Sequence, residues 1–265
     1  MSFWEHLDAL RGVVLKGAML TVALCVVLFI FMPEIFHTVI LAPCRPDFPL
    51  YSLLNCLPAM QGFSGGGQAG TAVSVVNLDL AAPLLLHCST ALWLAVILAM
   101  PALMGLAMSF IKPGLYKQEQ KTMRIGMTAL TVMFYLGVAT GYMVVFPVSL
   151  QFLYSYHVSA DVPNTISLTS YMDTLMTLSL GMGLLFELPL AAWLLGRLGL
   201  LHRGFFHRYR RHAVVALIVL AAIITPTTDP FTLMIVFLPS YLLWEAGAML
   251  VPPAKPKITD NEPIC

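Results

Sequence analysis

The feature that most constrains this chain is a series of apolar runs long enough to cross a lipid bilayer. The first extends from Val13 to Phe36 and is interrupted only by Lys16, Pro33 and Glu34, near its two ends. A spanning helix needs about 20 apolar residues to cross a hydrocarbon core of about 30 Å. Of all residues, 59% are hydrophobic and only 10% are charged, whereas soluble domains carry about 25% charge. The sequence therefore predicts a polytopic membrane protein.

The runs predict a single all-α membrane domain of six helices over residues 1–252. We expect the helices at about residues 13–36, 84–110, 125–153, 171–195, 212–225 and 231–250, with an extracytoplasmic loop at 37–83 and a cytoplasmic tail at 253–265. The last two helices are expected to be short. The uncharged run of the fifth, Ala213–Ile224, covers only about 18 Å at 1.5 Å per residue. The turn at Thr225–Pro230 predicts a helical hairpin.

Basic residues set the predicted orientation, because Lys and Arg concentrate on the cytoplasmic side of membrane proteins. With six helices and both chain ends in the cytoplasm, 13 of the 14 basic residues lie on that side, and only Arg45 lies on the other. The first helix is expected to stay in place, since Glu5 and Asp8 precede it and no small-residue cleavage site follows it.

Two cysteines share the loop at 37–83. In this orientation Cys44 and Cys56 face an oxidising compartment, where disulfides persist. They could form a bond that closes a short, proline-rich loop, or they could remain two thiols. The sequence leaves both alternatives open.

Three acidic positions fall within or between the predicted membrane helices. Glu187 lies in helix four beside Pro189, and a carboxylate there costs free energy unless it is paired, hydrated or protonated. It shares a helix face with Thr177, so it either docks a polar group of a partner helix or ties helix four to its own neighbours. Glu245 is expected to be an interface carboxylate near basic loops. Asp229, between two prolines, is expected to serve the turn.

Several function classes lack their sequence signals. The chain has no nucleophile elbow, HExxH or P-loop motif, and its cysteines and histidines match no metal-site spacing. We therefore expect no enzymatic activity, metal or cofactor. No basic, aromatic-rich platform for nucleic acid is present either. One alternative is an ion-coupled secondary transporter with Glu187 as its coupling site, although no internal repeat of the kind frequent in transporters is evident.

Four motifs, in order along the chain, resemble those of the TatC family, the polytopic core of the twin-arginine protein translocase. They are Phe3-x-x-His6-Leu7-x-x-Leu10-Arg11, Phe110-x-x-Pro113-Gly114-Leu115-Tyr116-x-x-Glu119, Phe186-Glu187-Leu188-Pro189, and Thr225-Pro226 with Asp229 and Pro239–Glu245. Together they cover nearly the whole chain.

The resemblance implies a bacterial inner-membrane protein that binds signal peptides bearing two consecutive arginines at its cytoplasmic face. It implies that TatA- and TatB-type single-span proteins are partners, along with membrane lipid and further copies of the chain, and that the proton-motive force drives export of folded proteins. The implied signal-peptide site comprises His6, Leu10, Arg11, Phe110, Pro113, Leu115, Tyr116 and Glu119. Glu187, with Pro189 and Thr177, would contact a partner's membrane helix, and Pro226, Asp229 and Glu245 would belong to the closing hairpin.

One departure from the family pattern bears directly on this site. Ala9 stands where the family has a glutamate. If the segment is helical, Glu5 lies one turn earlier on the same face. We predict that Glu5, with Asp8 as the lesser candidate, supplies the missing carboxylate beside Glu119. The alternative is that Glu5 is only a negative charge favoured at a helix N-terminus.

Overall fold

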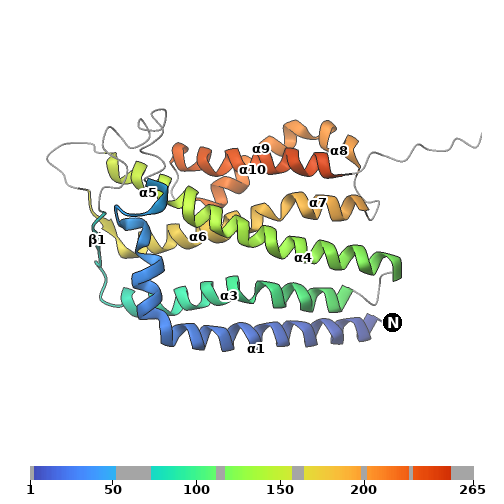
Figure 1. The fold of residues 1–265 in the computed structure, drawn as a ribbon, viewed down its shortest axis with the longest axis horizontal. Helices are drawn as coiled ribbons and strands as arrows, with labels where there is room; N and C mark the ends of the chain where they lie inside the picture. Colours follow the sequence, from blue (N-terminus) through green and yellow to red (C-terminus); the bar gives the residue numbers. More distant parts are fainter. Residues whose placement is uncertain are drawn as a thin grey trace, which may run out of the picture.

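The computed structural model describes residues 3–51, 73–111, 117–156, 164–197, 202–226 and 229–251, which form layers of roughly parallel and antiparallel helices (Figure 1). α1 (Phe3–Ile35) packs along α3 (Ala82–Ile111). The next layer holds α4 (Lys117–Thr140), α6 (Leu168–Phe186) and α7 (Leu188–Arg197). The last holds α8 (Arg203–Arg208), α9 (Arg210–Ile224) and α10 (Pro230–Leu250).

The end of the bundle opposite the N-terminus carries the irregular structure (Figure 1). α1 continues there into a π-helical turn, η1 (Phe36–Ile40), and a 3-10 turn, η2 (Ala42–Cys44). α4 continues through a second π-helical turn, η5 (Gly141–Val145), into α5 (Phe146–Ser155). The two-residue strands β1 (Val75–Val76) and β2 (Ile166–Ser167) pair in parallel, a small element that the all-α prediction did not include.

Three tyrosines fasten the irregular end of α1. The hydroxyls of Tyr142, Tyr171 and Tyr51 each donate to a main-chain carbonyl at 2.6 Å, those of Val39, Ile40 and Pro43 respectively. Irregular backbone leaves carbonyls without a helical N–H, and an apolar setting makes such groups costly. The tyrosines remove this cost and bind the end of α1 to α6 and η5.

A proline in α1 creates a similar need in the helix itself. Pro33 has no N–H to bond the carbonyl of Phe29, one turn earlier. The Nε2 atom of His87, on α3, lies 2.9 Å from that oxygen, and the imidazole stacks on the Phe29 ring with centroids 4.1 Å apart. His87 thus supplies the donor that Pro33 removes and joins α1 to α3.

Glycines bring α4 and α6 into very close contact. A Cβ atom on Gly137 would lie 2.5 Å from the carbonyl oxygen of Met182 and 2.8 Å from the Cα of Gly183. One turn later, a Cβ on Gly141 would lie 2.8 Å from the carbonyl oxygen of Leu178. Small residues at this spacing let two membrane helices approach until their backbones touch.

Among the described residues, five helical segments are long and apolar enough to cross a membrane. They are Leu7–Tyr51, Ala82–Phe110, Met123–Ser155, Leu168–Arg197 and Pro230–Leu250. α9, with 15 residues, is not among them and is short as predicted. The prediction that the last helix is also short is wrong, because α10 continues through Pro239 for 21 residues, or about 31 Å.

Helix boundaries differ from expectation in three further places. α1 begins at Phe3, so the opening motif is helical rather than a lead-in to a helix at residue 13. Predicted helix four is two helices, because the chain turns at Glu187, beside Pro189, between α6 and α7. α8 precedes the hairpin and was not anticipated. Residues 52–72 of the predicted loop and the tail from residue 252 lie outside the described residues.

Candidate functional site

The first two motifs lie at one end of the bundle. The N-terminus of α1, the end of α3 and the start of α4 are neighbours at the right of Figure 1. α1 runs antiparallel to α3, so residue 3 and residue 111 come to the same end, and α4 begins there at Lys117. The fold therefore brings together two segments that are separated by about 100 residues of sequence.

On α1, the predicted residues Asp8, Leu10 and Arg11 are exposed. Neither Asp8 nor Arg11 forms an ion pair with another described side chain. Glu5 and His6 lie in the first turns of the same helix, but their side chains are outside the described part of the structure. Glu5 precedes Ala9 by one helical turn. Because this segment is helical, Glu5 and Ala9 lie on the same face of α1.

On the facing segment, Phe110 is half-buried near the end of α3. Glu119 falls in the first turn of α4, where a negative charge favours the helix dipole, and its side chain is again outside the described part. Pro113, Leu115 and Tyr116 lie outside the described residues, as does Cys56. Cys44 is a free thiol in the structure, and its pairing with Cys56 stays a prediction.

A second candidate position is the turn between α6 and α7. Glu187 is half-buried there, and its Oε1 atom is buried with no hydrogen-bond partner among the described residues. Its neighbour Pro189 is buried, and Thr177, on the same side of α6, is half-buried. Whether Glu187 ties helix four to its own neighbours or contacts a partner helix stays a prediction; among the described residues, its Oε1 atom has no hydrogen-bond partner.

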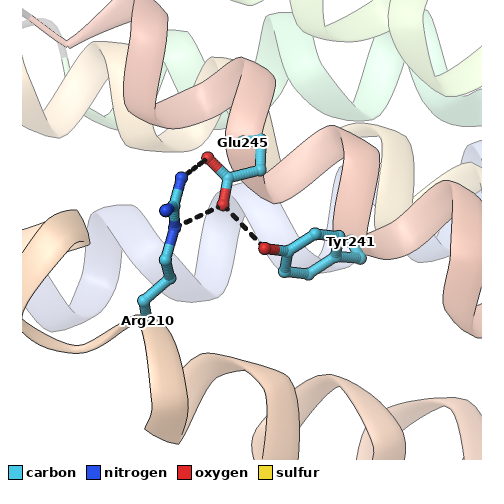
Figure 2. A network of polar contacts seen from close by, with 3 residues as sticks. All are labelled: Arg210, Tyr241 and Glu245. Carbon is cyan, nitrogen blue, oxygen red and sulfur yellow. Dashed lines mark hydrogen bonds and ion pairs between the residues drawn. The ribbon is translucent and has the colours of Figure 1, made fainter.

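A third position is the base of the closing hairpin, where the Glu245 carboxylate accepts hydrogen bonds from two side chains (Figure 2). Arg210 of α9 donates from Nε to Oε1 and from Nη2 to Oε2 of Glu245, both at 2.7 Å. The Tyr241 hydroxyl donates to Oε1 at 3.0 Å. Hydrogen bonding by the carboxylate raises the pKa of the Arg210 guanidinium above its ordinary value. Glu245 thus pairs with an arginine of the basic segment; its place at the membrane interface stays a prediction.

The sequence interpretation did not single out Arg210 or Tyr241. A signal for Tyr241 was present, because it precedes Glu245 by four residues and therefore shares its helix face. Arg210 could not be chosen among the neighbouring arginines Arg208 and Arg211, since only the packing of α9 on α10 decides which one points at Glu245.

Asp229, which was expected to serve the turn of the hairpin, caps the helix that follows the turn. Asp229 is the N-cap of α10, and its Oδ2 atom accepts the Thr232 N–H at 2.7 Å. Pro226, the second residue after the end of α9, is exposed. Capping satisfies one of the amide groups that a helix N-terminus leaves without a partner.

Comparisons of the sequence with known proteins point to one family. The sequence model of the family described as "Sec-independent protein translocase protein (TatC)" matches residues 5–239. A Sec-independent protein translocase protein TatC from Deinococcus radiodurans is 35% identical over 178 residues, which are 67% of this chain and 66% of that protein. The TatC protein of Blattabacterium sp. subsp. Periplaneta americana is 27% identical over 247 residues, 92% of either chain.

Solved structures show the same fold. The crystal structure of a twin arginine translocase receptor, TatC, superposes with a TM-score of 0.73 over 92% of this chain and 97% of that chain, at 22% identity. At that identity the likeness concerns the arrangement of the helices alone.

Proposed function

The chain belongs to the TatC family of Sec-independent protein translocase proteins, and on this premise we propose that it binds twin-arginine signal peptides at the end of the bundle that carries its N-terminus. It is a multi-pass membrane protein of a transport family. The observation that carries the proposal is the start of α1 at Phe3. This start sets Glu5 and Asp8 on a helix at the same end as the first turn of α4, where Glu119 lies.

The chemistry of the proposed ligand matches these residues. An arginine guanidinium is planar and always charged, and it binds a carboxylate through two parallel hydrogen bonds. Two consecutive arginines need two carboxylates from different directions. α4 contributes Glu119 and α1 contributes Glu5 or Asp8, so that one of these two residues replaces the acid that Ala9 lacks. Asp8 is exposed and makes no ion pair with a described side chain, which leaves it available.

We place this end in the cytoplasm of a bacterial cell. The described basic residues at this end include Arg11, Arg124, Arg197 and Arg210, and Arg45 lies at the other end. Lys and Arg are retained on the cytoplasmic side. A sixth crossing, with both chain ends inside, requires that α9 traverse the membrane with α10 although it has 15 residues. Packing against α6 and α10 would cover its short apolar run.

Glu187 is the proposed contact for a single-span partner of the TatA or TatB type. A buried carboxylate oxygen without a partner is costly in an apolar setting, and a polar group on an incoming helix would remove that cost. The partners would use the proton-motive force to move folded proteins across the membrane. The alternative of a secondary transporter is not retained, because the family to which the chain belongs is one of protein translocases.

The test is crosslinking in membranes from bacteria that lack their own TatC. A photoreactive residue at position 9, which leaves Glu5 and Asp8 in place, should crosslink a twin-arginine signal peptide, and a twin-lysine peptide should crosslink about tenfold less, since a lysine cannot form the bidentate pair. Equal crosslinking of the two peptides would contradict the proposal. Glu119→Ala should abolish the crosslink, and Glu5→Ala should weaken it. An intact export activity in Glu5→Ala would transfer the role to Asp8.

A further inference from the structure

An apolar groove separates α3 from α4 at the end of the bundle that carries the N-terminus. Its volume is about 690 Å³, and its walls include Met104, Gly105 and Met108 from α3 and Met127 from α4. On α3 the lining extends from residue 101 to 109, and on α4 from residue 124 to 132. Eight residues of helix rise about 12 Å, which approaches the depth of one leaflet of a hydrocarbon core about 30 Å thick.

The hydroxyl groups along the groove do not make it polar. Ser109 donates to the carbonyl of Leu106 at 2.7 Å, and Thr131 donates to that of Met127 at 3.1 Å. Thr128 donates in the same way to the carbonyl of Arg124. Because each hydroxyl is bonded to its own helix, the groove presents mainly methyl, thioether and aliphatic surface.

One charged side chain, that of Arg124, is among the residues that line the groove. Arg124 is exposed and has no ion pair or hydrogen bond from its guanidinium among the described residues. Both groove walls belong to segments apolar enough to span a membrane, and Arg124 lies at the start of the second of them. The site therefore combines an apolar groove about as deep as one leaflet with a cation that pairs with no described side chain. Because Arg124 lies at the start of a membrane-compatible segment, we expect it at the level of the lipid head groups.

We propose that this groove binds an anionic phospholipid of the adjacent leaflet, with an acyl chain between α3 and α4 and its phosphate on Arg124. Arginine suits phosphate because its planar fork donates two parallel hydrogen bonds. Lys112, Lys117 and Lys121 flank the groove in sequence, and a basic cluster of this kind attracts anionic lipid. Ser109 directly precedes Phe110, and Arg124 follows Glu119 by five residues on α4, so the groove adjoins the proposed signal-peptide site. Lipid binding in the groove does not depend on that proposed function.

The sign of the charge decides between a lipid and a peptide in the groove. A twin-arginine signal peptide carries its cations next to its apolar segment, so docking that segment between α3 and α4 would bring like charges to Arg124. Like charges at close range are destabilising. A phospholipid with a negative head group meets the same cation with attraction.

Gly105 offers a way to close the groove without disturbing the fold. A Cβ atom built on Gly105 has no heavy atom within 4 Å, so a large side chain there extends into open space. Substituting a helical glycine also favours the helix slightly. Ala102 is the matched control, because it is exposed on the same helix and does not line the groove.

The experiment measures lipid retained by the purified full chain in mild detergent, by native mass spectrometry with equimolar phosphatidylglycerol and phosphatidylcholine. We expect the unaltered chain to retain phosphatidylglycerol about fivefold over phosphatidylcholine, the effect of one basic residue near an anionic lipid. Arg124→Gln should reduce this ratio to about one. Arg208→Gln, which removes an exposed charge at the same end of the bundle, should preserve it.

The groove itself is tested by Gly105→Phe, which should lower the amount of either lipid retained, while Ala102→Phe should not. An unchanged lipid ratio in Arg124→Gln overturns the proposal, and so does unchanged retention in Gly105→Phe. A third contrary result is a signal peptide whose apolar segment crosslinks to position 105 and displaces the lipid. Loss of signal-peptide binding alone has no bearing on the lipid measurements, because lipid retention by each variant is measured before any peptide is added.

Discussion

The two glutamates of the C-terminal half, Glu187 and Glu245, occupy opposite chemical situations. Glu245 receives three hydrogen bonds, two from Arg210 and one from Tyr241 (Figure 2). Glu187 has a buried oxygen that no described residue contacts with a hydrogen-bond donor. In the sequence both residues are acids in or near apolar runs. Only their hydrogen-bond partners in the structure distinguish them.

The two regions are also held together by different forces. The hairpin base relies on a charged pair between α9 and α10, whereas the α6 region leading to Glu187 is held by glycine contacts with α4. Glu245, whose two carboxylate oxygens accept hydrogen bonds from Arg210 and Tyr241, serves the structure of the chain itself. Glu187, whose buried oxygen meets no described donor, is available to a partner helix. This contrast leads to four predictions, given from the largest expected effect to the smallest.

Gly137→Leu should separate α4 from α6 and destabilise the chain by about 3 kcal/mol, as overpacking at a backbone contact does. The new Cβ would lie 2.5 Å from the main-chain oxygen of Met182, which cannot rotate away. Thermal unfolding of detergent-solubilised protein, followed by size-exclusion fluorescence, measures the loss. Gly12→Leu is the control, because a Cβ on Gly12 has nothing within 4 Å. Equal melting of both variants would show that the α4–α6 contact is not close.

Glu187→Leu should leave the melting temperature of the isolated chain unchanged or raise it, because it removes a buried acceptor without a partner. The gain is at most about 1 kcal/mol, since the group is only half-buried. Export of a twin-arginine reporter should nevertheless fall about tenfold or more, because the partner helix loses its polar contact. Normal export in this variant would place the partner contact elsewhere.

Asp229→Ala should cost about 1 kcal/mol, the usual effect of losing a helix N-cap. The Thr232 N–H would lose the carboxylate oxygen that it now contacts at 2.7 Å. Asp229→Asn keeps an acceptor in the same place and should melt close to the unaltered chain. If the asparagine variant is as unstable as the alanine variant, the role of Asp229 is not capping.

Glu245→Gln and Arg210→Gln should each lower the melting temperature slightly, less than Asp229→Ala does, because the Arg210 side chain is half-exposed and solvent screens the pair. The double variant should be no less stable than either single variant, since both remove the same interaction. Export should persist in all three. Strictly additive losses would mean that the two residues act independently.

Much of this fold could be predicted from the sequence. The apolar runs located α3 and α9 to within about two residues, the basic residues marked one end of the bundle, and the four motifs identified the family. The expected bounds of α10, 231–250, lie within one residue of the observed ones, but the expectation that this helix is short was wrong, because it continues through Pro239. It also missed the turn at Glu187, although Pro189 was noted beside this residue.

The candidate site was predictable only in part. The motifs named Glu119, Glu187 and Glu245, and the helical start of α1 was needed before Glu5 could be aligned with Ala9. Arg124 drew attention only as one of several basic loop residues. Its place in the lining of an apolar groove follows from how α3 and α4 pack.

By itself, the sequence determined which segments are helical and membrane-compatible, because hydrophobic periodicity and length act along a single stretch of chain. Only the tertiary structure decided the partners. Arg210 meets Glu245 across 35 residues, and His87 reaches the Phe29 carbonyl across 58. Among the residues that the structure describes, the same packing gives the Glu245 carboxylate a partner and leaves the Glu187 Oε1 atom without one. Such pairings depend on the relative rotation and spacing of helices, which close packing fixes and no single segment encodes.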